Sequence, residues 1–190
     1  TLNGVTTGLV TVNSGTITGA YADLNTAFGD NNGTEITGLA DIAVTMSGSN
    51  SVANTNTIDG FTTGVVTTTV AENDMTTLAG LSGTGNAYAI SVTDGSVAAD
   101  ALAVLNGKTT GVITLTSTVV TGALSDLKSV YEANTAGEIA GLGNEVVAVS
   151  DTGTITAADL ITVNGLTTGV ITLTGVTGVT GTLADIKAVY

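Results

Sequence analysis

The chain has 190 residues, of which 43% are hydrophobic and 10% are charged, so it can bury enough apolar surface to fold. Its 16 acidic residues against 3 lysines give a net charge of −13, and a surface of this sign argues against nucleic acid as a partner. The absence of Cys excludes disulfides, thiolate metal sites and thiol nucleophiles. No apolar run approaches the ~20 residues that are needed to cross a membrane.

Seven short segments combine β-branched or aromatic residues with the alternation that is typical of strands. Their starts lie 33, 23, 23, 24, 34 and 24 positions apart, so that a short and a long spacing add up to a composite repeat near 58 residues. Spacing of this regularity indicates a repeat protein. In chain order the predicted strands are Leu9–Val12, Ile42–Met46, Val65–Thr69, Tyr88–Val92, Val112–Thr116, Val146–Val149 and Val170–Thr174.

Helical spacing of apolar residues, at intervals of three positions, occurs between these strands. The apolar sets are Met75, Leu78 and Leu81; Leu124, Leu127, Val130 and Tyr131; Leu160, Val163 and Leu166; and Leu183, Ile186 and Val189. Cap residues flank several of the predicted helices. The predicted capping boxes are Thr156–Asp159, Thr182–Asp185 and Ser51–Asn54, the predicted capping acids are Asp23, Asp126 and Asp185, and the predicted C-caps are Gly60, Gly107 and Gly165.

An eleven-residue phrase recurs through the chain. Asn164–Thr174 reads Asn-Gly-Leu-Thr-Thr-Gly-Val-Ile-Thr-Leu-Thr, and near copies occupy Asn106–Thr116, Asp59–Thr69 and Asn3–Asn13. A strand and a helix in every 23 to 34 residues match one coil of an α/β solenoid. We therefore predict that residues 1–190 form a single continuous array of about seven coils, each with one short parallel strand and one short helix. A closed domain and an all-β solenoid are the alternatives.

Two of the links between predicted strands are longer than the others and carry an additional Glu-Ile-x-Gly-Leu segment. These segments are Glu35–Leu39 and Glu138–Leu142, and we predict that they protrude from the stack and make lateral contacts. The chain starts at Thr1 and stops at Tyr190 within repeated sequence, so we expect it to be a piece of a longer array.

Gly107-Lys108-Thr109 resembles the tail of a phosphate-binding loop, but the first Gly of that loop is missing. Lys108 is also replaced by Val5, Phe61 and Leu166 in the other copies of the phrase, so it stands at a variable position. The chain has no His, and its Ser and Thr hydroxyls have no candidate base to activate them. We therefore predict that the protein is not an enzyme.

Four acidic residues are candidates for a calcium site. Asp94 and Asp151 each end a predicted strand, and Asp100 and Asp159 follow after a short turn. Carboxylates together with backbone carbonyls are ligands that Ca²⁺ prefers. However, neither an EF-hand nor a calcium-binding nonapeptide is present. The simpler interpretation is a turn Asp followed by a helix-capping Asp, and no cofactor is predicted.

Threonines form columns on the predicted strands. If Ile113 and Leu115 point inward, Thr114 and Thr116 point outward, because side chains alternate along a strand. Stacked coils would align such hydroxyls in ladders that resemble the flat Thr arrays of ice-binding solenoids. The columns are interrupted by Ala and Ser, and Thr is a common residue of exposed strands. Ice binding is therefore a remote alternative.

Three phrases carry a resemblance to known proteins, at residues 158–170, 78–88 and 138–145. They resemble the repeats of giant secreted bacterial surface proteins, which are common in marine cyanobacteria and some proteobacteria. The resemblance covers essentially the whole chain and implies a long acidic protein that is exported and displayed outside the cell. Members of that family are associated with surface layers, adhesion, motility or matrix.

These observations lead us to expect a non-enzymatic structural module of an extracellular fibre, surface layer or matrix. Such a module would act as a rigid spacer, and its partners would be copies of itself or adjacent repeats, without insertion into a membrane. The alternative is an adhesin repeat, with or without a dependence on calcium, that binds a cell-surface glycan through Glu35–Leu39 and Glu138–Leu142.

Overall fold

A computed structural model of the protein describes residues 6–189. The start of the first phrase, at Asn3, and the last residue of the predicted C-terminal helix, Tyr190, lie outside this range. The chain divides into two compact units. Unit 1 consists of Thr1–Glu72, Gly80–Ile90 and Lys108–Gly111, and unit 2 consists of Asn73–Ala79, Ser91–Gly107 and Val112–Tyr190.

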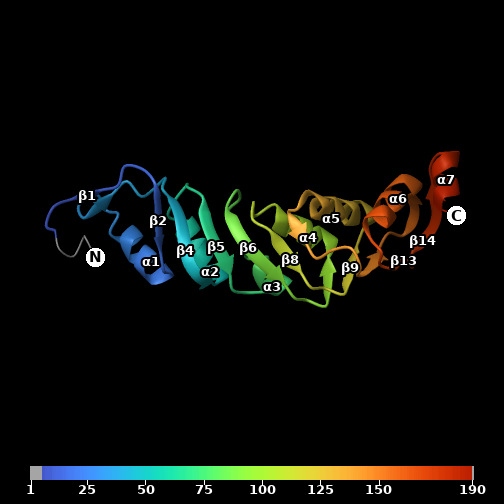
Figure 1. The fold of residues 1–190 in the computed structure, drawn as a ribbon, viewed down its shortest axis with the longest axis horizontal. Coiled ribbons are helices and arrows are strands. Elements are labelled where there is room, and N and C mark those ends of the chain that lie inside the picture. Colours follow the sequence, from blue (N-terminus) through green and yellow to red (C-terminus); the bar gives the residue numbers. More distant parts are fainter. Residues whose placement is uncertain (1–5, 190) are drawn as a thin grey trace. The chain divides into compact units, whose positions relative to one another are not determined.

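Unit 1 contains two parallel ladders and two helices (Figure 1). Strands β2, β4, β5 and β6 pair in that order, and β1 pairs with β3. The strands of unit 1 are β1 (Val10–Thr11), β2 (Thr16–Gly19), β3 (Ile36–Thr37), β4 (Ala43–Asn50), β5 (Val66–Val70) and β6 (Ala87–Val92), and the helices are α1 (Tyr21–Gly29) and α2 (Val52–Asp59).

Unit 2 contains three sets of parallel strands and a row of neighbouring helices (Figure 1). Strands β7, β9, β11 and β13 pair in that order, β8 pairs with β10, and β12 pairs with β14. The strands are β7 (Ser96–Ala98), β8 (Ile113–Leu115), β9 (Val119–Gly122), β10 (Ile139–Ala140), β11 (Val146–Val149), β12 (Gly153–Thr156), β13 (Ile171–Leu173) and β14 (Val176–Thr180). The helices are α3 (Met75–Leu78), α4 (Ala99–Asn106), α5 (Leu124–Ala136), α6 (Ala157–Leu166) and α7 (Leu183–Val189).

The mixed α/β class with parallel strands, which the sequence predicts, is confirmed. Residues 6–189 form seven helices and no closed barrel, and partners in the ladders are separated by 20 positions (Thr67 opposite Ala87) to 27 positions (Thr16 opposite Ala43). Parallel neighbours need a crossover connection, and a short helix occupies most of these connections. Within the described range, every helix is too short or too polar to span a bilayer.

All seven predicted strands are present, but the prediction of one strand per helix is wrong. A second strand precedes most helices, as in β2, β7, β9, β12 and β14. The predicted protrusions are also wrong, because Glu35–Leu39 contains β3 and Glu138–Leu142 contains β10, each paired in a ladder. Leu39 and Ile139 are buried. β2 and β12 are short and consist mainly of Thr and Gly, so they lack the apolar alternation that is typical of strands.

The core is built from the inward face of most strands and from one face of each of the helices α1 to α6, whereas α7 buries no side chain. In β5, Val66, Thr68 and Val70 are buried and the threonines between them are exposed, as a half-buried strand requires. The helical spacing predicted at Leu124 and Leu160 is confirmed, and these sets bury one face of α5 and α6. The set at Leu183 is helical but not buried, and the set at Met75 is helical only in part, because α3 ends at Leu78. Burying one such aliphatic side chain completely stabilises the folded chain by about 1.5–3 kcal/mol relative to leaving it exposed.

Most of the predicted helix caps are confirmed. Thr156 and Thr182 accept hydrogen bonds from the backbone N–H three positions later, as does Ser51. Gly60 and Gly107 are C-caps. Three of the predictions are wrong. Gly165 lies inside α6, since that helix continues to Leu166 and ends with a Thr C-cap. Asp23 and Asp126 lie in the first turns of α1 and α5 without capping them, because neither helix has a side-chain cap hydrogen bond from its own N-terminus.

Candidate functional site

The most regular contacts of the structure are made by the Thr-Thr-Gly segments inside the repeated phrase. They are Thr6–Gly8, Thr62–Gly64, Thr109–Gly111 and Thr167–Gly169. In each of the four, the amide of the Gly donates to the hydroxyl of the first Thr, at 2.9–3.1 Å. This bond closes a tight local turn, and the turn presents the remaining polar groups to a neighbouring segment.

The last three Thr-Thr-Gly segments bind backbone carbonyls 20 to 25 positions earlier in the chain. Thr62 Oγ1 donates to Ile42 O at 2.7 Å, and the equivalent hydroxyl of Thr109 donates to Tyr88 O at 2.8 Å. The amide of the second Thr also donates, from Thr63 to Ala40 O at 2.8 Å, from Thr110 to Asn86 O at 2.7 Å and from Thr168 to Gly143 O at 2.7 Å. The same residues therefore join consecutive parts of the fold at three places.

Glycine is required in these three segments because the backbone that they bind is too close for a side chain. A Cβ atom at Gly64, Gly111 or Gly169 would lie 2.4, 2.3 or 1.8 Å from the carbonyl oxygen of Ile42, Tyr88 or Glu145 respectively. Real Cβ atoms do not approach backbone oxygens so closely. The Gly of the repeated phrase is thus a contact residue.

Carboxylates form a second kind of contact between distant segments. The first backbone N–H of α2, α3 and α5 donates to Glu72, Asp94 and Asp151 at 2.9, 2.8 and 2.6 Å. Each acid lies 19 to 27 positions after the helix that it caps. A negative charge at a helix N-terminus satisfies a free donor and favours the helix dipole. Asp94 and Asp151, two of the calcium candidates, therefore cap helices formed by earlier residues.

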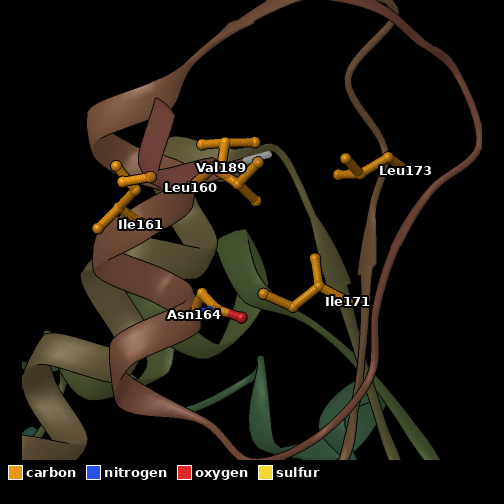
Figure 2. A pocket seen from close by; sticks show the side chains of 7 residues that line it. Leu160, Ile161, Asn164, Ile171, Leu173 and Val189 are labelled. Atoms are coloured by element: carbon orange, nitrogen blue, oxygen red, sulfur yellow. The ribbon is translucent and has the colours of Figure 1, made fainter. Parts of the chain in front are cut away.

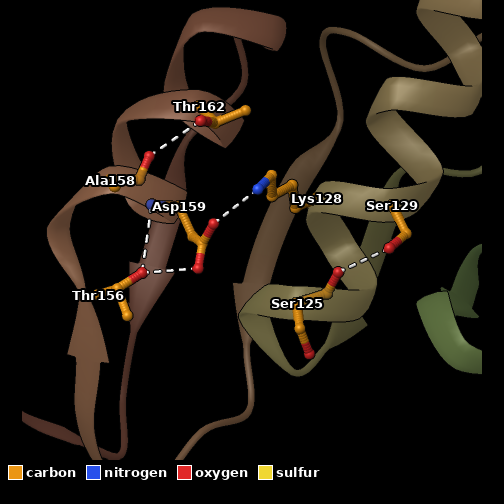
Figure 3. A network of polar contacts seen from close by, with 7 residues as sticks. All are labelled: Ser125, Lys128, Ser129, Thr156, Ala158, Asp159 and Thr162. Carbon is orange, nitrogen blue, oxygen red and sulfur yellow. Dashed lines mark hydrogen bonds and ion pairs between the residues drawn. The ribbon is translucent and has the colours of Figure 1, made fainter.

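The other two calcium candidates lie in first turns of helices. Asp100 accepts from the amide of Ala101 in α4. Asp159 forms a reciprocal capping box with Thr156 and an ion pair of 2.9 Å with Lys128 of α5 (Figure 3). The Thr156 hydrogen bond and then the Lys128 ammonium hold the pKa of Asp159 below its usual range. Among residues 6–189, no group of three or more acidic side chains is arranged to hold a metal ion.

A buried acid that the sequence did not single out, Glu145, organises the turn before β11. Its side chain is 4% exposed and accepts hydrogen bonds from the Tyr131 hydroxyl and from the amides of Gly143 and Asn144. Burial, and then the carboxylate of Glu145, raises the pKa of Tyr131. Three donors around one buried carboxylate replace the water that it loses.

Asn86 has the corresponding role in unit 1. Its side-chain oxygen accepts from the amide of Val66 at 2.7 Å, and its amide group donates to Asp59 at 2.6 Å. A signal in the sequence was available, because Gly85–Ala87 and Gly143–Glu145 share the Gly-Asn pair that precedes a strand. Nothing in the sequence indicated that one of the two turns would bury an acid.

A cavity of about 240 Å³ lies between α6, α7 and β13 (Figure 2). Its lining is apolar except for Asn164 and includes Leu160, Ile171, Leu173 and Val189. None of these side chains supplies a nucleophile, an acid or a base. The predicted Thr columns are also discontinuous, since Thr45 lies opposite Thr67 but Thr67 lies opposite Ala87.

Comparisons of the chain with protein-family models, curated proteins and solved structures find no match.

Proposed function

We propose that the protein is a non-enzymatic structural module in which successive segments stack as the coils of an α/β solenoid. The observation that carries this proposal is the set of three Thr-Thr-Gly segments that bind backbone 20 to 25 positions earlier. The parallel ladders also join successive segments of the chain. So do the carboxylates that cap α2, α3 and α5, because each of them comes from a later segment than the helix. In a solenoid, contacts between adjacent coils supply most of the stability and resist bending.

The role that fits such a module best is a rigid spacer in an extracellular fibre, surface layer or matrix. The polar groups that we find at recurring positions satisfy backbone and helix ends, and the apolar cavity beside α6 has no catalytic lining. The high negative charge keeps such a chain soluble and limits nonspecific association. The extracellular location rests on the resemblance to secreted surface proteins.

Mechanical unfolding of single molecules tests this proposal. The full chain, joined at both ends to marker domains of known unfolding force, is stretched at constant speed. A stacked spacer keeps its folded length at low force and then unfolds in discrete cooperative steps. Smooth lengthening from the lowest forces would contradict a rigid structural role.

Binding of the chain to a panel of cell-surface glycans, with and without Ca²⁺, tests the adhesin alternative. The adhesin alternative requires Glu35–Leu39 and Glu138–Leu142 to protrude. Both segments instead contain strands that are paired in ladders. We expect no saturable glycan binding in either condition. Saturable glycan binding that a chelator abolishes would instead support the hypothesis of a calcium-dependent adhesin.

A further inference from the structure

The segment Asn32-Gly33-Thr34 is the one place in the chain where an Asn is followed two positions later by a Ser or Thr. This spacing is the acceptor sequence for N-linked glycans in secreted proteins. All three residues are exposed, and a Cβ atom added at Gly33 would meet no other atom within 4 Å. The acceptor sequence is therefore accessible on the surface of unit 1.

The side chain of Asn32 closes a turn around this sequence. Its carboxamide oxygen accepts hydrogen bonds from the Thr34 hydroxyl at 2.6 Å and from the amides of Thr34 and Glu35 at 2.8 and 3.0 Å. Its nitrogen donates to the Glu35 carboxylate at 3.4 Å, which is long for a hydrogen bond. The turn thus fixes the carboxamide through its oxygen and binds its nitrogen only weakly.

The equivalent segment of unit 2 forms without the Asn-Gly-Thr turn. Asn31 and Asn134 are equivalent, and the side-chain oxygen of each accepts from the amide of a Leu eight positions later, at 3.4 and 3.2 Å. The next three residues are Asn-Gly-Thr in unit 1 but Thr-Ala-Gly in unit 2, where α5 continues to Ala136. The contact with the Leu amide is therefore common to both copies and does not depend on the acceptor sequence.

We propose that Asn32 is an acceptor for an N-linked glycan. The co-substrate is an oligosaccharide that is joined through pyrophosphate to a membrane lipid. The Asn32 nitrogen attacks the first carbon of the sugar and forms a C–N bond, while the bond from that carbon to the pyrophosphate oxygen breaks. The lipid pyrophosphate leaves with the electron pair of that bond, and the nitrogen gives one proton to a base of the transferase.

The turn favours this reaction through the carboxamide oxygen. Negative charge develops on that oxygen as the nitrogen loses its proton, and the Thr34 hydroxyl and the two backbone amides already donate to it. The inference rests on the proposed extracellular role, because the transfer takes place on the exported side of a membrane.

Intact-mass measurement after glycan transfer in vitro tests the proposal. The folded full chain is incubated with an oligosaccharyltransferase and its lipid-linked oligosaccharide, in parallel with a short acceptor peptide that shows the enzyme to be active. We expect one glycan per parent chain and none on Asn32→Gln. Thr34→Ser should keep the modification. Thr34→Val removes the hydroxyl but keeps both backbone amides, and should lower the initial rate by at least about tenfold.

Thermal melts show whether each variant is folded, and all three should melt like the parent chain because the turn is exposed. A parent chain that gains no mass while the peptide is modified would overturn the inference. So would equal rates for Thr34→Ser and Thr34→Val, or a glycan that is still attached to Asn32→Gln. The mechanical experiment is independent, because the unmodified chain can be a rigid spacer and a chain that is not rigid can carry a glycan.

Discussion

Residues 120–130 and 179–189 have closely similar sequences, Val-Thr-Gly-Ala-Leu-Ser-Asp-Leu-Lys-Ser-Val and Val-Thr-Gly-Thr-Leu-Ala-Asp-Ile-Lys-Ala-Val, and both form the end of a strand followed by a helix. In the first, Val120, Leu124 and Leu127 are buried, whereas of their equivalents in the second Val179 and Ile186 are only half-buried and Leu183 is exposed. Helix α5 packs against both α4 and α6, and α7 packs against α6. The apolar side chains of such a copy are therefore buried where helices pack against it on both sides, and exposed where only one helix does.

Paired leucine deletions should produce the largest difference between the two regions. Leu124→Ala should lower the free energy of unfolding by about 2–5 kcal/mol, because it leaves a cavity in the core. Leu183→Ala, at the equivalent exposed position, should change it by less than about 0.5 kcal/mol. Urea denaturation at a protein concentration that keeps the chain monomeric measures both. Equal losses would contradict the dependence of burial on neighbours.

Alanine substitutions of two glycines in the same copy of the phrase should also differ in their effect on stability. Gly169→Ala places a methyl group against Glu145 O and should cost about 1–3 kcal/mol, or more if the backbone cannot shift. Gly165→Ala, inside α6 with open space around it, should be neutral or stabilising by up to about 1 kcal/mol. Thermal melts followed by circular dichroism compare them. Similar melting temperatures would show that the Thr-Thr-Gly contact is not tight.

The two buried tyrosines, Tyr88 and Tyr131, make the stability of the folded chain depend on pH under alkaline conditions. Burial raises the pKa of Tyr88 and Tyr131 above the ordinary value of 10, so the unfolded chain releases these protons at lower pH than the folded chain. Stability from the neutral phenols is fully present below pH 10 and is lost as the pH rises above it, by about 1.4 kcal/mol per pH unit for each tyrosine.

Absorbance at alkaline pH measures this effect, because ionised tyrosine absorbs at longer wavelength. Tyr88 and Tyr131 should ionise only together with unfolding. Tyr131→Phe should reduce the alkaline slope of stability, although loss of its hydrogen bond to Glu145 lowers stability at neutral pH too. Ionisation of both tyrosines near pH 10 in a folded chain would contradict their burial.

A smaller effect is expected at the N-terminus of α5. Asp151→Ala removes the acceptor of the Leu124 amide and should cost about 0.5–2 kcal/mol, as other N-cap deletions do. Asp126→Ala, in the first turn of the same helix, should cost less, because α5 has no side-chain cap from that turn. Urea denaturation of the two variants decides which acid caps the helix. If Asp126→Ala lowered the free energy of unfolding more than Asp151→Ala, Asp151 would not be the acid that caps α5.

The sequence predicted the seven apolar strands and the helices at Leu124, Leu160 and Leu183 correctly, because alternation and three-residue spacing are local signals. It missed β2 and β12 because their Thr-rich sequences carry little apolar signal, and it misjudged Glu35–Leu39 because pairing with β1 is a long-range event. The recurrence of Thr-Thr-Gly in the repeated phrase is visible in the sequence, but the binding of these residues to a distant backbone is not. The same limit applies to Asp94 and Asp151, whose partners lie 19 and 27 positions away.

The central claim is that the Thr-Thr-Gly segments at Thr62, Thr109 and Thr167 bind the backbone of the segment 20 to 25 positions earlier. Amide hydrogen exchange of the monomeric chain, followed residue by residue with NMR, tests it directly. The amides of Thr63, Thr110 and Thr168 donate to carbonyls at 2.7–2.8 Å and should exchange slowly. The amide of Thr7, the equivalent residue at the first copy, should exchange at the rate of an exposed loop. Equal rates at all four threonines would contradict the claim.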